Sequence, residues 1–273
     1  MSKSFCLFVF FAFTLYGQSS CVMPYETPLI KYLKPIEISE LESGVESIDC
    51  MYVINLDKRP EKWQRMQVLF DERGMHGNRV SGVKGWEIPI EIQQELAGYY
   101  PIRLPKGCLG CLLSHISVIK NAYERNFNRI WVFEDDVEFQ EDIQQIPELL
   151  ARLSKIDPEW DVFYTDIDSK NNEGVPILSL GSDFRPDQKY RLLEYYTKRN
   201  LVSDDIMRVR QRFGLYSYVV SRNGMKKIID YFTHVYLWTA VDVDIHYIPG
   251  IREYSTVKDV VTIWTLSGVS DNY

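Results

Sequence analysis

The chain has 273 residues, of which 45% are hydrophobic and 14% aromatic, and its formal net charge is −7. This composition excludes a disordered chain, and the length suits one large α/β domain or two small ones. The acidic balance argues against a nucleic-acid-binding surface, which needs a concentration of basic residues. We therefore expect a packed domain with no nucleic-acid partner.

The N-terminus has the pattern of a secretory signal peptide. Lys3 precedes an apolar stretch at residues 5–15, and small or polar residues follow it. The apolar stretch is shorter than the roughly 20 residues that span a membrane. We predict a signal peptide at residues 1–20, which implies export, a secretory lumen or membrane association through the N-terminus. An uncleaved tether and a location on the cytoplasmic face remain alternatives.

Residues 21–47 contain prolines and acids without strong periodicity, which predicts a linker. The domain, residues 48–273, opens with the apolar run Cys50–Leu56, which is typical of a strand covered on both faces. Pro60 suits the first turn of the following helix, and Gly74 suits its end.

Strand and helix patterns continue to alternate along the chain. A short strand is expected within residues 76–85, a buried helix from Lys106, and strands at 129–133 and 159–166. A last strand is expected before a turn at Asn223–Gly224 and a helix. This alternation predicts a mainly parallel sheet covered on both sides, with ligands bound beyond the carboxyl ends of its strands.

Two cysteines, Cys108 and Cys111, have the spacing of a redox or zinc pair. No second such pair accompanies them in the sequence, and on a helix they lie on neighbouring positions of one face. We interpret them as packing residues of the buried helix, with a functional pair as the alternative.

Three consecutive carboxylates, Glu134, Asp135 and Asp136, directly follow the strand at 129–133. If the extended chain continues, the first and third point to the same side. Two such oxygen ligands suit Mg²⁺ or Mn²⁺, and a cation held by few carboxylates keeps positions open for phosphates. The alternative is a solvated turn in which an acid caps the next helix.

Several segments, in order from Tyr52 to about Asp244, resemble glycosyltransferase family 25. The segments are "YVINLDKRPEKW", "KGCLGCLLSH", the three acids, "WDVFY", "YSYVVSRNGMKKII" and "AVDVDI". Two positions depart from the family pattern: Cys108 stands where the family has Glu, and Lys62 where it often has Arg.

The resemblance implies a nucleotide-diphospho-sugar transferase fold of the GT-A, Rossmann-like type in a single domain with a mainly parallel sheet. It implies inverting, metal-assisted transfer of galactose or glucose from a UDP-sugar to a hydroxyl of a glycan, lipopolysaccharide or protein. The implied cofactor is Mn²⁺ or Mg²⁺, and the implied partners are the nucleotide sugar and the glycan or protein acceptor.

The resemblance also implies roles for individual residues. The expected metal ligands are Glu134, Asp136 and His246. The expected donor-binding residues are Asn55, Leu56, Arg59 and Asp135. The expected catalytic bases are Asp242, which has the family match, and Asp244, which faces the same side if the segment is extended.

Two other functions use the same residues differently. One is a catalytically silent family member that acts as an exported glycan- or protein-binding module. The other is a metal-dependent phosphodiesterase or hydrolase. The retained acids favour the transferase over the silent module, whereas an export signal conflicts with UDP-sugars made in the cytosol.

Overall fold

The computed structural model describes residues 27–171, 173, 175, 177, 185, 186, 188 and 191–264, without the side chain of Leu193. The predicted signal peptide at residues 1–20 lies outside them. Within the described residues, no helix combines the length and the apolar character that a membrane span requires.

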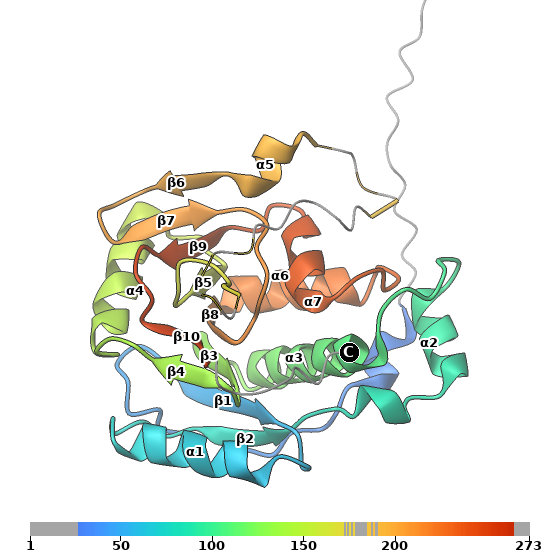
Figure 1. Cartoon of the computed structure of the whole chain (residues 1–273), viewed down its shortest axis with the longest axis horizontal. Helices are drawn as coiled ribbons and strands as arrows, with labels where there is room; N and C mark the ends of the chain where they lie inside the picture. The colour runs from blue at the N-terminus through green and yellow to red at the C-terminus, as the bar shows by residue number, and fades with distance from the viewer. Residues whose placement is uncertain are drawn as a thin grey trace, which may run out of the picture.

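An eight-stranded sheet forms the centre of the molecule (Figure 1). Its strands, in spatial order, are β2 (Asn78–Ser81), β1 (Cys50–Asn55), β3 (Arg129–Glu134), β8 (Ser217–Ser221), β5 (Val162–Tyr164), β9 (Glu253–Thr256), β7 (Ile206–Val209) and β6 (Arg199–Leu201). A second sheet pairs β4 (Val137–Phe139) with β10 (Val261–Ile263) in antiparallel fashion.

The direction of the strands decides which ends meet at one edge. β1 pairs in parallel with β2 and β3, β5 pairs in parallel with β9, and β8 runs antiparallel between β3 and β5. β7 is antiparallel to both β9 and β6. In the eight-stranded sheet, all strands except β7 and β8 therefore run in one direction. The predicted α/β class with a mainly parallel sheet is confirmed, and β1, β3 and β5 end at the same edge.

Helices cover both faces of the sheet. The helices are α1 (Pro60–Asp71), α2 (Ile90–Ala97), α3 (Lys106–Glu124), α4 (Gln145–Ile156), α5 (Leu193–Thr197), α6 (Arg222–Phe232) and α7 (Val241–Asp244). Short 3₁₀ helices are η1 (Pro28–Tyr32), η2 (Gly85–Glu87) and η3 (Ile245–Tyr247).

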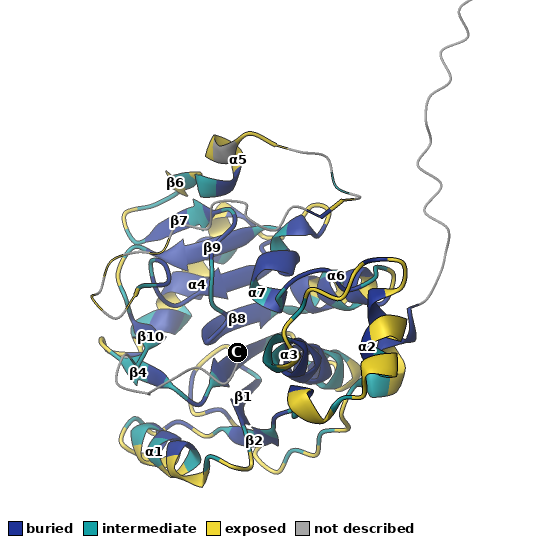
Figure 2. Cartoon of the chain, turned by 45° about the vertical axis from the view of Figure 1, so that its right-hand side comes forward, coloured by how far each residue is buried: buried dark blue, intermediate teal, exposed yellow. Residues whose placement is uncertain are grey.

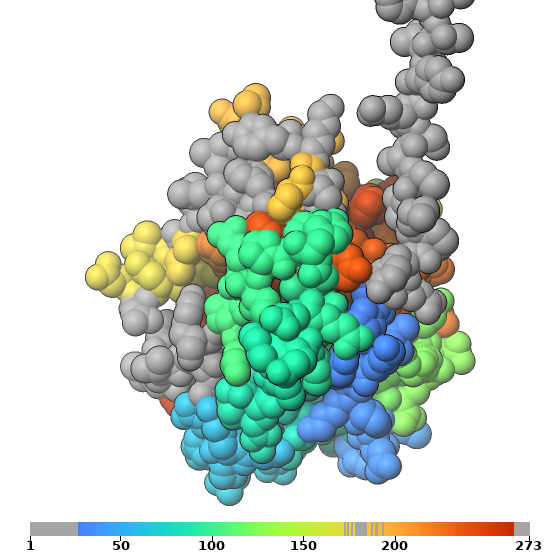
Figure 3. Space-filling model, turned by 90° about the vertical axis from the view of Figure 1, so that its right-hand side faces the viewer, coloured from blue at the N-terminus to red at the C-terminus, as the bar shows by residue number. Residues whose placement is uncertain are grey.

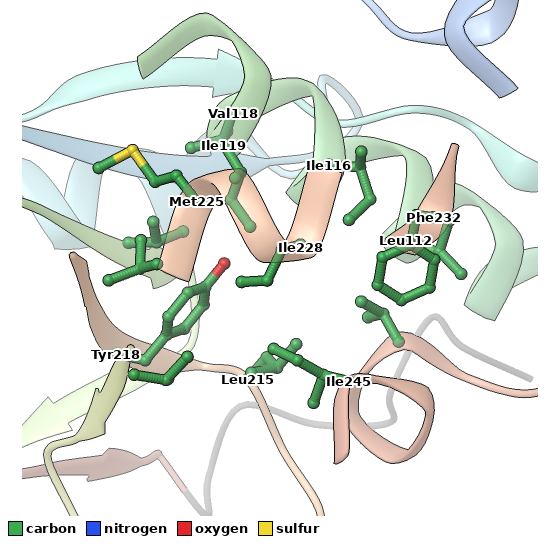
Figure 4. Packing of buried hydrophobic residues seen from close by; sticks show 14 of the residues in the cluster. Leu112, Ile116, Val118, Ile119, Leu215, Tyr218, Met225, Ile228, Phe232 and Ile245 are labelled. Atoms are coloured by element: carbon green, nitrogen blue, oxygen red, sulfur yellow. The ribbon is translucent and has the colours of Figure 1, made fainter. Parts of the chain in front are cut away.

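Two hydrophobic clusters occupy the two faces. One includes side chains of α3, α6 and α7, and Figure 4 shows Leu112 and Ile116 of α3 with Ile228 and Phe232 of α6 in it. The other packs α1 and α4 against the opposite face, with Trp131 and other side chains of the strands. The central strands are buried on both faces (Figure 2), as the continuous apolar run in β1 predicts.

Proline, glycine and serine residues mark the helix ends. Pro60 stands at the first turn of α1, and Gly74 adopts a positive φ of 63° just beyond its end. The turn predicted at Asn223–Gly224 is wrong, because both residues lie in the first turn of α6. Ser221 caps this helix by accepting a hydrogen bond from the Gly224 amide, so the helix begins earlier than the Asn-Gly pair indicates.

The described part of the segment predicted as a linker, residues 27–47, lies on the domain. The Thr27 amide donates to the carbonyl of Thr233, and the Lys34 amide donates to Ser117 of α3. Leu29, Val45 and nearby Ile48 are buried in the hydrophobic clusters. Figure 3 shows this segment, in blue, lying against the green surface of α2.

Candidate active site

A cavity of about 80 Å³ opens at the sheet edge where β1 and β3 end. Its lining includes Lys62 of α1, Cys111 and His115 of α3, and the three consecutive acids Glu134, Asp135 and Asp136. We call residues Glu134–Asp136 the acid loop. The sheet edge is where a mainly parallel sheet is expected to bind its ligand.

The acid loop is a turn rather than an extended strand. Glu134 is the last residue of β3, pairs in register with Ile54 of β1, and its amide donates to the carbonyl of Tyr216. Asp135 and Asp136 form the turn into β4. The condition under which the first and third acids would share one side is therefore not met, yet all three line the same cavity.

Lys62 supplies positive charge to the acid loop. Its ammonium lies 3.1 Å from Oδ2 of Asp136 and 3.6 Å from Oδ1 of Asp135, and its side chain is almost fully buried. Among the described charged side chains that line the cavity, this one lysine faces three carboxylates. The loop thus keeps two negative charges in excess when all three acids are ionised.

Asp136 is incompletely satisfied by this ion pair. Its Oδ1 is buried and has no hydrogen-bond partner among the described residues. Burial first, and then the neighbouring charge of Glu134, raise the pKa of Asp136 from its ordinary 3.8 to about 6. Burial also raises the pKa of Asp135, against the lowering effects of Asn55 and Lys62. Such raised values indicate a site that would gain from an additional cation.

Two of the four expected donor-binding residues do not line the cavity: Arg59, which directly precedes α1, and Asn55. Leu56 and Asp135 line the cavity. The buried amide of Asn55 instead donates to Oδ2 of Asp135 at 2.6 Å and to the carbonyl of Arg59 at 2.9 Å, and its oxygen accepts from Arg79 at 2.7 Å. Asn55 therefore ties the end of β1 to the acid loop through these hydrogen bonds.

His115 and Cys111 stand next to Glu134, although the sequence analysis favoured a packing role for Cys111. Nε2 of His115 lies 3.3 Å from Oε1 of Glu134, and Sγ of Cys111 lies 4.0 Å from the same oxygen. Nδ1 of His115 is 3.0 Å from the Tyr218 hydroxyl. Cys108 and Cys111 are half-buried and form no disulfide, and Cys111 packs against the core cluster that contains α3. The four-residue spacing of Cys111 and His115 on one helix is the signal that predicts their proximity.

Asp242 and Asp244 do not face the same side. They lie in the short helix α7, which packs against α3, and the extended geometry expected for this segment is not found. Oδ2 of Asp242 accepts a hydrogen bond from the Gly214 amide at 2.8 Å. Burial is the largest cause that raises the pKa of Asp242, and the charge of Glu134 adds to it, so Asp242 lies within electrostatic reach of the acid loop.

Asp244 points into the protein interior instead. It forms a fully buried ion pair with Arg185 at 2.7 Å and accepts a hydrogen bond from the Tyr231 hydroxyl at 3.2 Å. These contacts give Asp244 a structural role and leave Asp242 as the candidate base. Asp166, at the end of β5, is similarly paired with Arg212 and Tyr216 and is separated from Glu134 by β8.

His246, an expected metal ligand, is used on both ring nitrogens. Nδ1 lies 2.8 Å from Oε2 of Glu253, and Nε2 lies 2.9 Å and 3.0 Å from the carbonyl oxygen and amide nitrogen of Arg212. The structure thus places His246 in a buried polar network rather than beside Glu134 and Asp136. Sequence order alone could not show this, because Arg212 is 34 residues away and Glu253 reaches His246 only through the placement of β9.

The loop at residues 82–87 forms the wall opposite the acid loop. Ser114 of α3 accepts a hydrogen bond from the Val83 amide at 2.8 Å and donates to the Gly110 carbonyl at 2.7 Å. Trp86 lines the cavity and carries the Lys58 ammonium 4.1 Å above its ring. The cavity therefore combines an anionic floor with an aromatic wall.

Comparisons with known proteins agree with this geometry. A family model described as "Glycosyltransferase family 25 (LPS biosynthesis protein)" matches residues 48–245, which include Lys62, the acid loop and Asp242. A "Glycosyltransferase 25 family member" of Drosophila melanogaster is 27% identical over 160 residues, 55% of this chain and 26% of that protein.

Two mammalian relatives show the same pattern. "Procollagen galactosyltransferase 2" of Mus musculus is 29% identical over 151 residues, 48% of this chain and 23% of that protein. "Inactive glycosyltransferase 25 family member 3" of Homo sapiens is 32% identical over 126 residues, 42% of this chain and 21% of that protein. The chain thus covers about a quarter of the length of these relatives.

Proposed function

Since the chain belongs to glycosyltransferase family 25, we propose that it transfers a hexose, galactose or glucose, from a UDP-sugar to a hydroxyl of a glycan, lipopolysaccharide or protein. The mixed α/β structure with its mostly parallel sheet is compatible with a GT-A-like fold. The observation that carries the proposal is the excess negative charge of the acid loop in a cavity at the carboxyl edge of the sheet.

The acid loop fits a hard divalent cation. Its donors are carboxylate oxygens, the type that Mg²⁺ and Mn²⁺ prefer, and the buried Oδ1 of Asp136 has no partner among the described residues. Glu134 and Asp136 would hold the ion, and His246 is left out because its ring nitrogens are engaged. When bound, such an ion neutralises negative charge on the departing diphosphate.

The chain's own residues define the rest of the reaction. Lys62 holds Asp135 and Asp136 in the cavity through its ion pairs. Asp242 accepts the proton of the acceptor hydroxyl, and the Gly214 amide orients its carboxylate. The raised pKa of Asp242 makes it a stronger base than an exposed aspartate. A cavity of about 80 Å³ is too small for a whole nucleotide sugar, so the nucleoside lies outside it.

A silent binding module is the second candidate. Lys62 already neutralises part of the negative charge of the acid loop, and the similar human protein is named inactive. In this alternative the cavity binds a glycan or protein without turnover. The two functions differ in whether a nucleoside diphosphate and a divalent cation bind together.

Thermal melting with UDP and Mn²⁺ tests the proposal. We expect UDP to raise the melting temperature only when Mn²⁺ is present, because a divalent ion would neutralise the repulsion between the diphosphate and the acid loop. Glu134→Gln removes a charge without changing size and should abolish this rise. Glu138→Gln, on the adjacent strand β4, is the matched control and should keep it.

Hydrolysis of a UDP-hexose panel then tests turnover. Asp242→Asn should keep the UDP-dependent rise and slow hydrolysis, in which water takes the place of the acceptor, by about 10²- to 10⁴-fold, the usual contribution of a general base. The transferase proposal fails if Glu134→Gln keeps wild-type hydrolysis. A wild-type chain that melts identically with and without every nucleoside diphosphate favours the silent module.

A further inference from the structure

We propose that Cys111, His115 and Glu134 form a binding site for a thiophilic transition metal of the Zn²⁺ class, distinct from the hard-cation use of the acid loop. One ligand atom from each residue lies within 4.8 Å of the other two. Carboxylate, imidazole and thiolate together are a donor set that zinc binds in proteins.

The distances fit such a site closely. Zinc bonds of about 2.0 Å to nitrogen and oxygen and about 2.3 Å to sulfur place tetrahedral ligand atoms roughly 3.3–3.6 Å apart. The observed separation between Nε2 of His115 and Oε1 of Glu134 is 3.3 Å, and that between Sγ of Cys111 and Oε1 is 4.0 Å. The Sγ–Oε1 distance must shorten by about 0.5 Å, and Sγ lies within 4.8 Å of Nε2. Cys111 and Glu134 are half-buried, which leaves room for this adjustment.

Tyr218 provides the supporting contact that a histidine ligand needs. Its hydroxyl lies 3.0 Å from Nδ1 of His115, within the buried cluster beneath α3 (Figure 4). The hydroxyl can accept a hydrogen bond from Nδ1–H or donate one to an unprotonated Nδ1. When the hydroxyl accepts, Nε2 carries a free lone pair for the metal, as metal-bound histidines require. When it donates, Nε2–H is free to bond Glu134 in the metal-free protein.

Proton balance follows from the ligand set. Cys111 binds as the thiolate, so its proton passes to solvent as the metal–sulfur bond forms, and no electron is transferred. Two protein ligands come from adjacent turns of the rigid helix α3 and the third from the end of β3. A fourth position faces the cavity, because all three residues line it.

The site shares Glu134 with the proposed Mn²⁺ or Mg²⁺ site, and this consequence rests on the proposed function. One carboxylate at 3.3 Å from an imidazole cannot serve both ions fully, so a thiophilic metal and the hard cation compete. The thiolate decides which ion prevails, since soft sulfur selects Zn²⁺ over Mg²⁺ and Mn²⁺.

Titration of the metal-free full chain with Co²⁺, a coloured substitute for Zn²⁺, tests the site without measuring activity. We expect a thiolate-to-cobalt charge-transfer band that saturates at one ion per chain and that Zn²⁺ removes. Cys111→Ser should abolish the band and weaken Zn²⁺ binding by at least about 100-fold. Cys108→Ser, a half-buried cysteine on the same helix but outside the cluster, should keep both.

The Co²⁺ band in the wild-type chain and in its variants decides whether the cysteine site exists. Absence of the band in the folded wild-type chain, or a band that survives Cys111→Ser, overturns the inference. Circular dichroism confirms that the Ser variant is folded, and Glu134→Gln provides a second variant that should weaken Co²⁺ binding. A Co²⁺ band that Mn²⁺ does not displace agrees with the preference of the thiolate for softer metals and supports the cysteine site, while the UDP-dependent melting shift tests the proposed transferase separately.

Discussion

The carboxylate of Asp136 is buried and only partly paired, which disfavours its ionised form. Lys62 contacts its Oδ2, its Oδ1 has no partner among the described residues, and Glu134 adds repulsion nearby. Burial is the largest effect on its pKa, which rises from 3.8 to about 6. The folded chain therefore binds a proton at Asp136 in a pH range where the unfolded chain has lost it.

The sign of the stability effect follows from this difference. Between about pH 4 and pH 6 the native state holds more protons than the unfolded state, so stability falls as the pH rises. We expect metal-free Asp136→Asn to be more stable than wild type at about pH 7.5, by at most about 3 kcal/mol, and the gain to vanish near pH 4. Urea unfolding in the presence of a chelator measures it.

Asp57 provides a control of opposite sign. Hydrogen bonds from Ser81 and Arg79 lower its pKa, so it stabilises the fold when ionised. Asp57→Asn should lose stability at neutral pH and lose the difference in acid. If both variants change stability in the same direction at about pH 7.5, the electrostatic explanation for Asp136 is incorrect.

The residues of the site differ in how far the sequence predicts them. Three consecutive acids after an apolar run are visible without a structure, because strand ends and charge clusters are local features. Asp244 and His246 were assigned roles from their place in a segment, yet their partners Arg185 and Glu253 are distant in sequence or depend on the packing. Which buried group satisfies which charge is a tertiary property that spacing does not encode.

At the scale of elements, the contact between α3 and the 82–87 loop sets one wall of the cavity. Gly85 and Gly110 lie where the two backbones meet: a Cβ at Gly110 would stand 2.4 Å from the Val83 carbonyl oxygen. Ser114 adds a hydrogen bond to the Val83 amide. Glycine at position 110 therefore allows a backbone approach that no larger residue permits.

Gly110→Ala tests this contact. In an ordinary helix interior the change stabilises by about 0.5–1 kcal/mol, whereas here the clash with backbone should reverse the sign and destabilise by about 1–3 kcal/mol. Chemical unfolding measures the change. Lys120→Ala, on the more exposed side of the same helix, should stay within about 0.5 kcal/mol of wild type. A stabilised Gly110→Ala variant would show that the loop moves away freely.

Elements with strong local signals were predicted well, and those that depend on capping or pairing were not. β1, α1, α3 and β3 begin within a residue of their predicted positions, because apolar runs, Pro60 and the residues around 106 define them locally. The Asn223–Gly224 turn failed because the Ser221 cap outweighs the turn preference of the pair. β6 and β7, which lie at one side of the sheet, were not predicted, because they have only three and four residues and β6 is mostly polar.

At the scale of the whole molecule, the reversed strand β8 decides which carboxylates share a site. Adjacent parallel strands bring Asn55 and Glu134 together, while β8 separates Glu134 from Asp166. Alternating strands and helices predict the mainly parallel class but not this reversal, because strand order is a property of the assembled sheet. The candidate site consequently lies at the β1–β3 edge, between α1, α3, α7 and the 82–87 loop.

The segment before β1 belongs to the same packed unit in the described residues. Leu29 is 0% exposed in the cluster that contains α3 and α6, and the neighbouring Ile30 is 43% exposed. A flexible linker would bury neither side chain. Substitutions at these two residues can therefore distinguish a flexible linker from a packed part of the domain.

We expect Leu29→Ala to lower the free energy of unfolding by about 2–5 kcal/mol, because it leaves a cavity in the core. Ile30→Ala should change it by no more than about 0.5 kcal/mol, because its side chain already contacts water. Urea unfolding of both variants, followed by fluorescence, makes the comparison. Equal and small effects would mean that residues 27–47 detach in solution, and the domain would then begin near residue 48, as the sequence analysis predicts. A large effect at Leu29 alone would show that the folded unit extends to Thr27. Helix α3, which lines the cavity, is then supported by the sheet on one side and by this segment on another.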